Sequence, residues 1–166
     1  NSSLSPTKIT LETWMYAKSF SSSPCADCAP IIWHQGKGYR FGTGNGAGVD
    51  VQFFDGSSTK TLKSSMTLST NAWHHLAVTY DSAKIKMYID GSLTDSVAAT
   101  FTLNYSSKGA DVWIVDPATG YGGTLEETRI WNYARNFKEI REGMLKSYKS
   151  GTKGLMLQLS YDDGVP

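Results

Sequence analysis

Three groups of residues have side chains whose type and spacing could support chemistry. They are the thiols Cys25 and Cys28, the adjacent histidines His74 and His75, and the adjacent carboxylates Glu126–Glu127 and Asp162–Asp163. Such residues serve metal or disulfide chemistry, general acid–base catalysis, and glycosidic bond cleavage, respectively.

The segment from Cys25 to Cys28 has several chemical interpretations. A zinc site needs two more ligands, and the histidines of this sequence lie at no finger-like spacing from the cysteines. A thioredoxin-type redox pair expects the start of a helix in a βαβ unit, which this pattern lacks. A small-loop disulfide in an exported protein is the interpretation we prefer, and it would stiffen the loop that carries Asp27. In a cytosolic protein the same residues would be two free thiols.

The two histidines begin the segment WHHLAVTYD, which is typical of a strand. Side chains alternate across a strand, so Trp73 and His75 share one face while His74 and Leu76 share the other. Catalysis would require a nucleophile or an acid in register beside a histidine, and the sequence offers none nearby. We therefore interpret both histidines as packing residues that find hydrogen-bond partners.

The elements that position these residues are mostly short strands. Alternation and turn residues predict strands at 9–17, 31–35, 38–44, 49–56, 60–68, 73–81, 84–91, 95–101, 110–116, 125–131 and 154–162. One helix is expected within 136–147, where Asn136 and Glu139 have the spacing of a capping box. These elements predict an all-β fold: a two-sheet antiparallel β-sandwich, or jelly roll, with one short helix near the C-terminus.

Length and charge narrow the functional classes. The 166 residues suit one domain spanning 1–166, and the net charge of +1 gives no electrostatic footprint for nucleic acid. No apolar run is long enough to insert into a membrane, and no cleavable signal pattern opens the chain. The opening residues NSSLSPTK look like a cut edge, so we expect a module of a larger protein.

Three motifs resemble one known family. WHHLAVTYDSAKIKMYIDG is similar to the signature hairpin of the laminin G-like, concanavalin A-type jelly roll. ITLETWMYA resembles the opening strand of that family, and GTLEETRIWNYARNFKEI resembles its closing strand and helix, with Glu126 where the pattern has Asp. The resemblance covers most of residues 9–142. It implies the jelly roll, but the fold serves glycan binding, protein adhesion and glycan cleavage alike.

Glycan cleavage is the function that the carboxylates argue against. Jelly-roll glycosidases need two carboxylates that flank the scissile bond. Glu126 and Glu127 are adjacent, so a regular strand would point them to opposite faces, and Asp162 and Asp163 have the same defect. We expect a protein without catalytic residues.

Calcium is the cofactor that the resemblance suggests. Relatives, and the similar pentraxins, hold Ca²⁺ at one rim through loop carboxylates and carbonyls. The resemblance would bring Asp27 and Asp116 near the same rim, and Glu126 occupies the Asp position of the closing motif. These three residues are the candidate metal ligands.

Aromatic residues suggest a carbohydrate as the partner. Trp14, Trp73 and Trp131 occupy pattern positions of the family, for which core packing is the default. Other rings lie near loops, where they could stack on the apolar face of a sugar. The candidate ligand-binding residues are Trp33, His34, Tyr39, Trp113, Asp116, Thr119 and Tyr121. We therefore expect an extracellular or cell-surface, lectin-like module.

The alternative is an adhesive module that binds protein. Family members usually begin with one more strand than this chain contains, and GLMLQLSYDDG resembles the terminal strand that would pair beside it. An open sheet edge of this kind accepts a strand from another chain.

Overall fold

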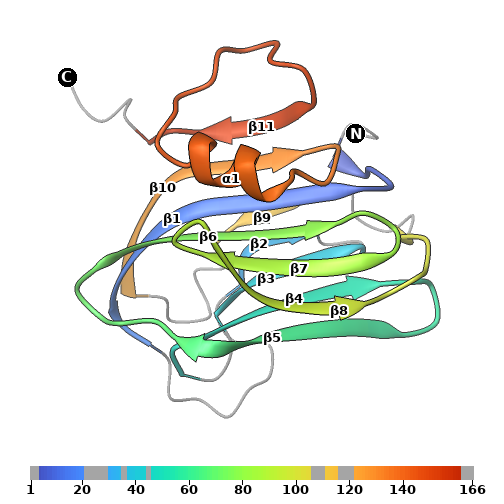
Figure 1. Cartoon of the computed structure of the whole chain (residues 1–166), viewed down its shortest axis with the longest axis horizontal. Helices are drawn as coiled ribbons and strands as arrows, with labels where there is room; N and C mark the ends of the chain where they lie inside the picture. Colours follow the sequence, from blue (N-terminus) through green and yellow to red (C-terminus); the bar gives the residue numbers. More distant parts are fainter. Residues whose placement is uncertain are drawn as a thin grey trace.

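Two antiparallel sheets, one of six strands and one of five, form the protein (Figure 1). The computed structural model describes residues 4–20, 30–34, 37–43, 46–105, 111–115 and 122–161. Core side chains from both sheets meet between them, among them Leu11, Phe41 and Val78. The predicted two-sheet sandwich is confirmed.

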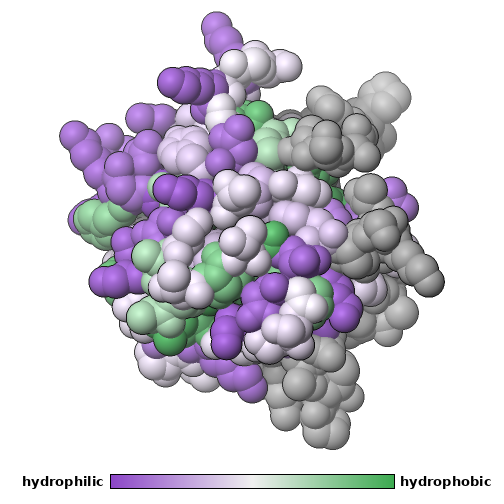
Figure 2. All heavy atoms as spheres, turned by 90° about the vertical axis from the view of Figure 1, so that its right-hand side faces the viewer, coloured by the Kyte–Doolittle hydropathy of each residue, from purple (hydrophilic) through white to green (hydrophobic). Residues whose placement is uncertain are grey.

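The strands follow the predicted segments closely. The six-stranded sheet has the order β11 (Leu155–Leu159), β10 (Gly122–Trp131), β1 (Ile9–Ser19), β6 (Trp73–Tyr80), β7 (Lys84–Ile89) and β8 (Ser92–Ala98). The five-stranded sheet has the order β5 (Thr59–Thr67), β4 (Gly48–Phe54), β3 (Tyr39–Thr43), β2 (Pro30–His34) and β9 (Val112–Ile114). Figure 2 shows one end of this sandwich, where hydrophobic residues appear only in small patches among hydrophilic ones.

The β7–β8 turn explains why β8 begins earlier than the predicted 95–101. Asp90 and Gly91 have φ angles of 51° and 71°, as in the type I′ turn that Asp-Gly pairs favour. Both carboxylate oxygens of Asp90 are used, because Oδ1 accepts from the His75 amide (2.8 Å) and Oδ2 contacts His74 Nδ1 (2.9 Å). A two-residue turn lets β8 pair with β7 directly from Ser92 onward.

The predicted helix forms but is short. Helix α1 spans Phe137–Gly143 and has the expected capping box between Asn136 and Glu139. The helix ends at Gly143 rather than at the predicted residue 147. At this end the buried Arg129 donates to the Gly143 carbonyl through Nη1 (3.3 Å) and to the Lys146 carbonyl through Nη2 (2.5 Å). Figure 1 shows α1 lying across the outer face of the six-stranded sheet. Among the described residues, no helix has the length and apolar character needed to cross a membrane.

Candidate functional site

A row of side chains crosses the outer face of the five-stranded sheet. Trp33 of β2 lies opposite Trp113 of β9, and their ring centroids are 5.8 Å apart at an interplanar angle of 57°. On its other side Trp33 lies opposite Arg40 of β3, which in turn lies opposite Gln52 of β4. Opposite residues of neighbouring strands share a face, so two indoles, a guanidinium and an amide form one continuous strip.

The strip is accessible to a ligand. Trp113 is 39% exposed, and Trp33, Arg40 and Gln52 are half-buried. The inward neighbours Ile32 and Phe41 are fully buried, so each of these strands presents one face to the core and one outward.

A shallow pocket of about 190 Å³ adjoins this row. Its lining residues come from β2, β3, β4 and the turns beside them: Trp33, Lys37, Gly38, Tyr39, Arg40, Gln52, Phe54 and Thr59. The Lys37 ammonium lies 4.2 Å from the centre of the Phe54 ring, a cation–π arrangement. The lining therefore combines two cations and aromatic surface with no carboxylate.

The turn before β3 holds the pocket in shape. Lys37 and Gly38 have φ angles of 68° and 84°, in the left-handed region. A side chain at Gly38 would overlap the ring of Tyr105, so this close approach also requires glycine. The glycine allows the turn that presents Lys37 beside Phe54.

Two predicted ligand-binding residues, His34 and Tyr39, lie mainly inside the sandwich, and each is only 2% exposed. The His34 Nε2 atom is 3.3 Å from the Ser5 hydroxyl, and the ring packs 4.9 Å from the Tyr105 ring. Burial lowers the pKa of His34, and burial raises the pKa of Tyr39, whose hydroxyl donates to the Leu4 carbonyl (3.2 Å). Both side chains therefore pack within the sandwich, and Tyr39 also contributes to the lining of the pocket.

Six of the predicted site residues lie outside the part of the chain that the structure describes. The candidate ligand residues Asp116, Thr119 and Tyr121, the candidate metal ligand Asp27 and the thiols Cys25 and Cys28 lie outside the described residues. Of the candidate metal ligands only Glu126 is described, and it is exposed on the outer face of the six-stranded sheet beside Trp14. Within the described ranges, no three His, Cys, Asp or Glu side chains gather closely enough to hold a metal ion.

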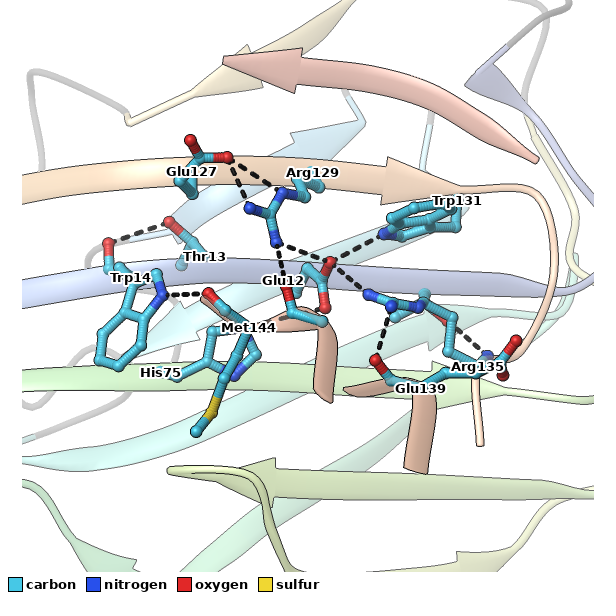
Figure 3. Close-up of polar contacts among 12 residues, drawn as sticks. Glu12, Thr13, Trp14, His75, Glu127, Arg129, Trp131, Arg135, Glu139 and Met144 are labelled. Carbon is cyan, nitrogen blue, oxygen red and sulfur yellow. Dashed lines mark hydrogen bonds and ion pairs between the residues drawn. The ribbon is translucent and has the colours of Figure 1, made fainter. Parts of the chain in front are cut away.

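A buried ionic cluster lies under α1 on the outer face of the six-stranded sheet (Figure 3). Oε1 of the fully buried Glu12 accepts from Arg135 Nη1 (2.7 Å), Trp131 Nε1 (2.9 Å) and Arg129 Nη1 (3.4 Å). Arg129 also donates to Glu127 Oε2 through Nε (3.1 Å) and Nη2 (2.6 Å). Two carboxylates thus balance two guanidiniums, as buried charges require.

His75 lies beside this cluster without carrying a charge, and neither of its ring nitrogens makes a hydrogen bond within the described residues, contrary to the prediction. It is fully buried, and its Nε2 is 3.8 Å from Glu12 Oε2. Burial, together with the charges of Arg129 and Arg135, lowers the pKa of His75 to about 3. The sequence indicated no acid near the histidines; Glu12 comes from the neighbouring strand, so the proximity depends on strand order.

The adjacent carboxylates Glu126 and Glu127 do not point to opposite faces as predicted. A β-bulge interrupts the β1–β10 ladder. Between the pairs Glu12–Arg129 and Trp14–Glu126, β10 has two residues where β1 has one. Glu127 takes the extra position with a φ of 50°, and both carboxylates line one outer pocket. Oε2 of Glu127 nevertheless accepts two hydrogen bonds from Arg129, which ties this carboxylate to the buried cluster.

Three tryptophans were assigned to core packing, and the structure separates them. Trp131 is 1% exposed and fits that prediction. Trp14 is half-buried, and Trp73 is 40% exposed on the outer face of the six-stranded sheet, so the core assignment of Trp73 was wrong. Conversely, sequence reasoning did not identify Lys37, Arg40 and Gln52, although alternation in GYRFGTG and VDVQFFDG points the latter two away from the core.

Known structures share this architecture. A candidate carbohydrate-binding protein from Bacteroides ovatus superposes with a TM-score of 0.71 at 21% identity, covering 95% of this chain and 46% of that one. The receptor-binding domain of botulinum neurotoxin type G gives 0.65 at 17% identity, covering 82% and 37%. The binding domain of Paraclostridial Mosquitocidal Protein 1 gives 0.65 at 14% identity, covering 82% and 36%. The present chain spans less than half of each of these.

Sequence comparison identifies the family. A search among curated proteins found no match. The family model Laminin_G_3, which describes the concanavalin A-like lectin/glucanase superfamily, matches residues 1–141, a range that contains both tryptophans of the outer row. The chain belongs to the concanavalin A-like lectin/glucanase superfamily.

Proposed function

We propose that this protein is a non-catalytic carbohydrate-binding module that holds a sugar on the outer face of its five-stranded sheet. The observation that carries the proposal is the cross-strand pair of Trp33 and Trp113, continued in the same row by Arg40 and Gln52. Indole faces stack on the apolar faces of pyranose rings, and guanidinium and amide groups hydrogen-bond to hydroxyl oxygens.

Binding without cleavage is favoured by the composition of the pocket. Hydrolysis requires an acid and a second carboxylate on either side of the glycosidic bond. The lining beside Trp33 contains Lys37 and Arg40 but neither Asp nor Glu. The exposed ammonium of Lys37 further suggests that acidic sugars bind more tightly than neutral ones at this site.

The binding test is a glycan array followed by titration of the best ligand. Trp33→Ala is expected to weaken binding about tenfold, the value of roughly one stacking contact. Arg40→Gln should reduce the affinity for acidic sugars more than that for neutral ones. Phe137→Ala is the matched control, because this ring is also exposed (45%) but belongs to α1 on the other sheet. Silence on the array, or equal affinities for Trp33→Ala and the control, would refute the proposal.

Calcium and an extracellular setting are parts of the same proposal. The array is run with calcium and again with a chelator. Loss of binding in chelator would support Asp27 and Asp116 as ligands, and their substitution by Asn would be the next step. Unchanged binding would remove calcium from the proposal and leave the aromatic row as the site. An extracellular protein should also carry the Cys25–Cys28 disulfide, which thiol labelling with and without reductant would detect.

A second candidate function is the capture of a protein strand at the sheet edge. An apolar groove of about 610 Å³ lies beside β9 and the first half of β10, and the β11 ladder ends at Thr128. Its lining includes Ile114, Leu125 and Leu159. Strand addition would bury such side chains and extend a ladder. Size-exclusion chromatography with light scattering tests this: dimers or polymers favour it, and a monomer at high concentration argues against self-capture.

A further inference from the structure

The outer face of the six-stranded sheet also has an open aromatic end. Helix α1 and the segment after it bury Glu12, His75 and Trp131 on this face. Beyond the part of the sheet that α1 and the following segment cover, the outward side chains change from charged to aromatic. Tyr16 of β1 lies opposite Trp73 of β6, with ring centroids 5.5 Å apart at an interplanar angle of 55°.

A pocket of about 350 Å³ lies where the cover ends. Its lining residues come from strands β1, β6 and β10 and from the segment after α1: Trp14, Trp73, Glu126, Glu127, Arg129, Met144, Leu145, Lys146 and Ser147. Two of them expose apolar surface, Leu145 at 79% and Trp73 at 40%. Exposed large apolar side chains that gather in one pocket are typical of binding sites rather than of plain surface.

Buried contacts hold the walls of this pocket in place (Figure 3). The indole nitrogen of Trp14 donates to the Met144 carbonyl (2.7 Å), which fixes both the ring and the segment above it. Arg129, which is 1% exposed, binds Glu127 (2.6 Å) and the Lys146 carbonyl. The site therefore needs little rearrangement to receive a ligand.

Glu126 is the acceptor that this framework leaves available. It is exposed, and its carboxylate makes no hydrogen bond or ion pair with another described residue. The bulge at Glu127 places it on the same side as Trp14. A carboxylate beside an indole can accept hydrogen bonds from hydroxyl groups of a ring that stacks on the indole.

The charges of the lining decide the ligand class. Glu126 and Glu127 are offset by Arg129 and Lys146, so the pocket carries no net charge, in contrast to the two cations of the Trp33 pocket. We propose that Trp73, Trp14 and Glu126 form a second sugar-binding site, selective for neutral pyranose rings, on the sheet opposite the first site. This inference rests on the proposed function and extends it.

Two sites on opposite outer faces make the module bivalent. The outer faces of a sandwich point away from each other, with two sheets packed about 10 Å apart between them. One short oligosaccharide does not reach both sites. A polysaccharide engaged at one site therefore leaves the other site for a second chain, and the module bridges glycan chains with the gain in avidity that linked sites provide.

Indole NMR signals test the inference site by site, because the chain contains 5 tryptophans. The protein is titrated with neutral cello-, manno- and galacto-oligosaccharides, and the peaks are assigned with single Trp→Phe variants. The Trp73 peak is expected to shift, and to shift equally in Trp33→Ala. The Trp131 indole, which donates to Glu12 (2.9 Å), serves as the internal reference that does not move.

Variants and cross-linking complete the test. Trp73→Ala and Glu126→Gln should each weaken the second site about tenfold. Both should reduce turbidity with a neutral polysaccharide, while Phe137→Ala changes neither readout. A Trp73 peak that stays still while Trp33 saturates would overturn the second site and leave the proposed function intact. Shifts caused only by cationic peptides would also overturn it. No shift at either tryptophan with any glycan would remove both.

Discussion

Replacing Glu12 with Gln should remove much of the stability of this domain. Glu12 is fully buried, and its Oε1 faces Arg135 Nη1 at 2.7 Å and Arg129 Nη1 at 3.4 Å. Glutamine keeps the shape and an acceptor oxygen for the Trp131 indole, so the substitution tests charge rather than packing. One guanidinium then stays buried without a balancing carboxylate, because Glu127 offsets only Arg129.

The size of the effect follows from this geometry. At an effective dielectric constant of about 20, unit charges 2.7 Å apart attract by about 6 kcal/mol. The amide dipole of glutamine recovers part of that loss. Breaking a buried ion pair by removing one partner typically costs about 3–5 kcal/mol. For a domain of this size, that corresponds to a fall in Tm of about 6–20 °C.

Urea unfolding followed by tryptophan fluorescence measures the loss. Glu142→Gln is the matched control, because Glu142 makes an exposed i,i+4 pair with Lys138 at 3.9 Å, which is worth about 0.5 kcal/mol or less. The slope of the free energy of unfolding against urea should stay unchanged if the native state keeps its compactness. If Glu12→Gln costs no more than the control, the cluster does not stabilise the fold electrostatically and the reasoning is wrong.

Three further predictions concern the same sheet. Because the folded-state pKa of His75 is lowered to about 3, the unfolded state binds the proton first as the pH falls. The contribution of His75 to the free energy of unfolding is therefore complete above about pH 6.5. It is lost as the pH drops toward 3, by at most about 1.4 kcal/mol per pH unit. His75→Gln should flatten that slope in unfolding curves measured across pH. Gly143→Ala should destabilise by about 1–3 kcal/mol, since the new methyl group would overlap Arg135 Nη2, and a thermal melt that rises instead would contradict this. Asp90→Ala should cost about 1–2 kcal/mol by removing the acceptor of the His75 amide, with the exposed Asp111→Ala as comparison.

The elements of the fold were predictable because they depend on local rules. Alternation located the strands, the Asn136–Glu139 spacing located the start of the helix, and Asp90-Gly91 located a turn. Each of these signals lies within a few residues of the chain. The order of the strands does not follow from these signals, and the resemblance to a known family implied only a jelly roll.

The parts of the site that were not predictable depend on distant contacts or on a break in a local rule. Trp33 and Trp113 were both named, but nothing in the sequence shows that β2 and β9 are neighbours. The single extra residue of the bulge at Glu127 reverses the expected facing of its neighbour, and alternation assumes that no such residue exists. The exposure of Trp73 depends on where the segment after α1 ends, which no local pattern specifies.

The two outer faces differ because one of them anchors the helix. Glu12, His75 and Arg129 resemble catalytic residues by type, yet all three are buried. Arg129 binds the carbonyls of Gly143 and Lys146 and so holds the end of α1 and the segment after it on the six-stranded sheet. The five-stranded sheet has no described helix on its outer face, so aromatic and cationic side chains there remain accessible. A ligand can therefore use the full width of one face but only the uncovered end of the other. The two proposed sites differ accordingly: one is a row of side chains across several strands, and the other is a single pocket at the end of the segment after α1.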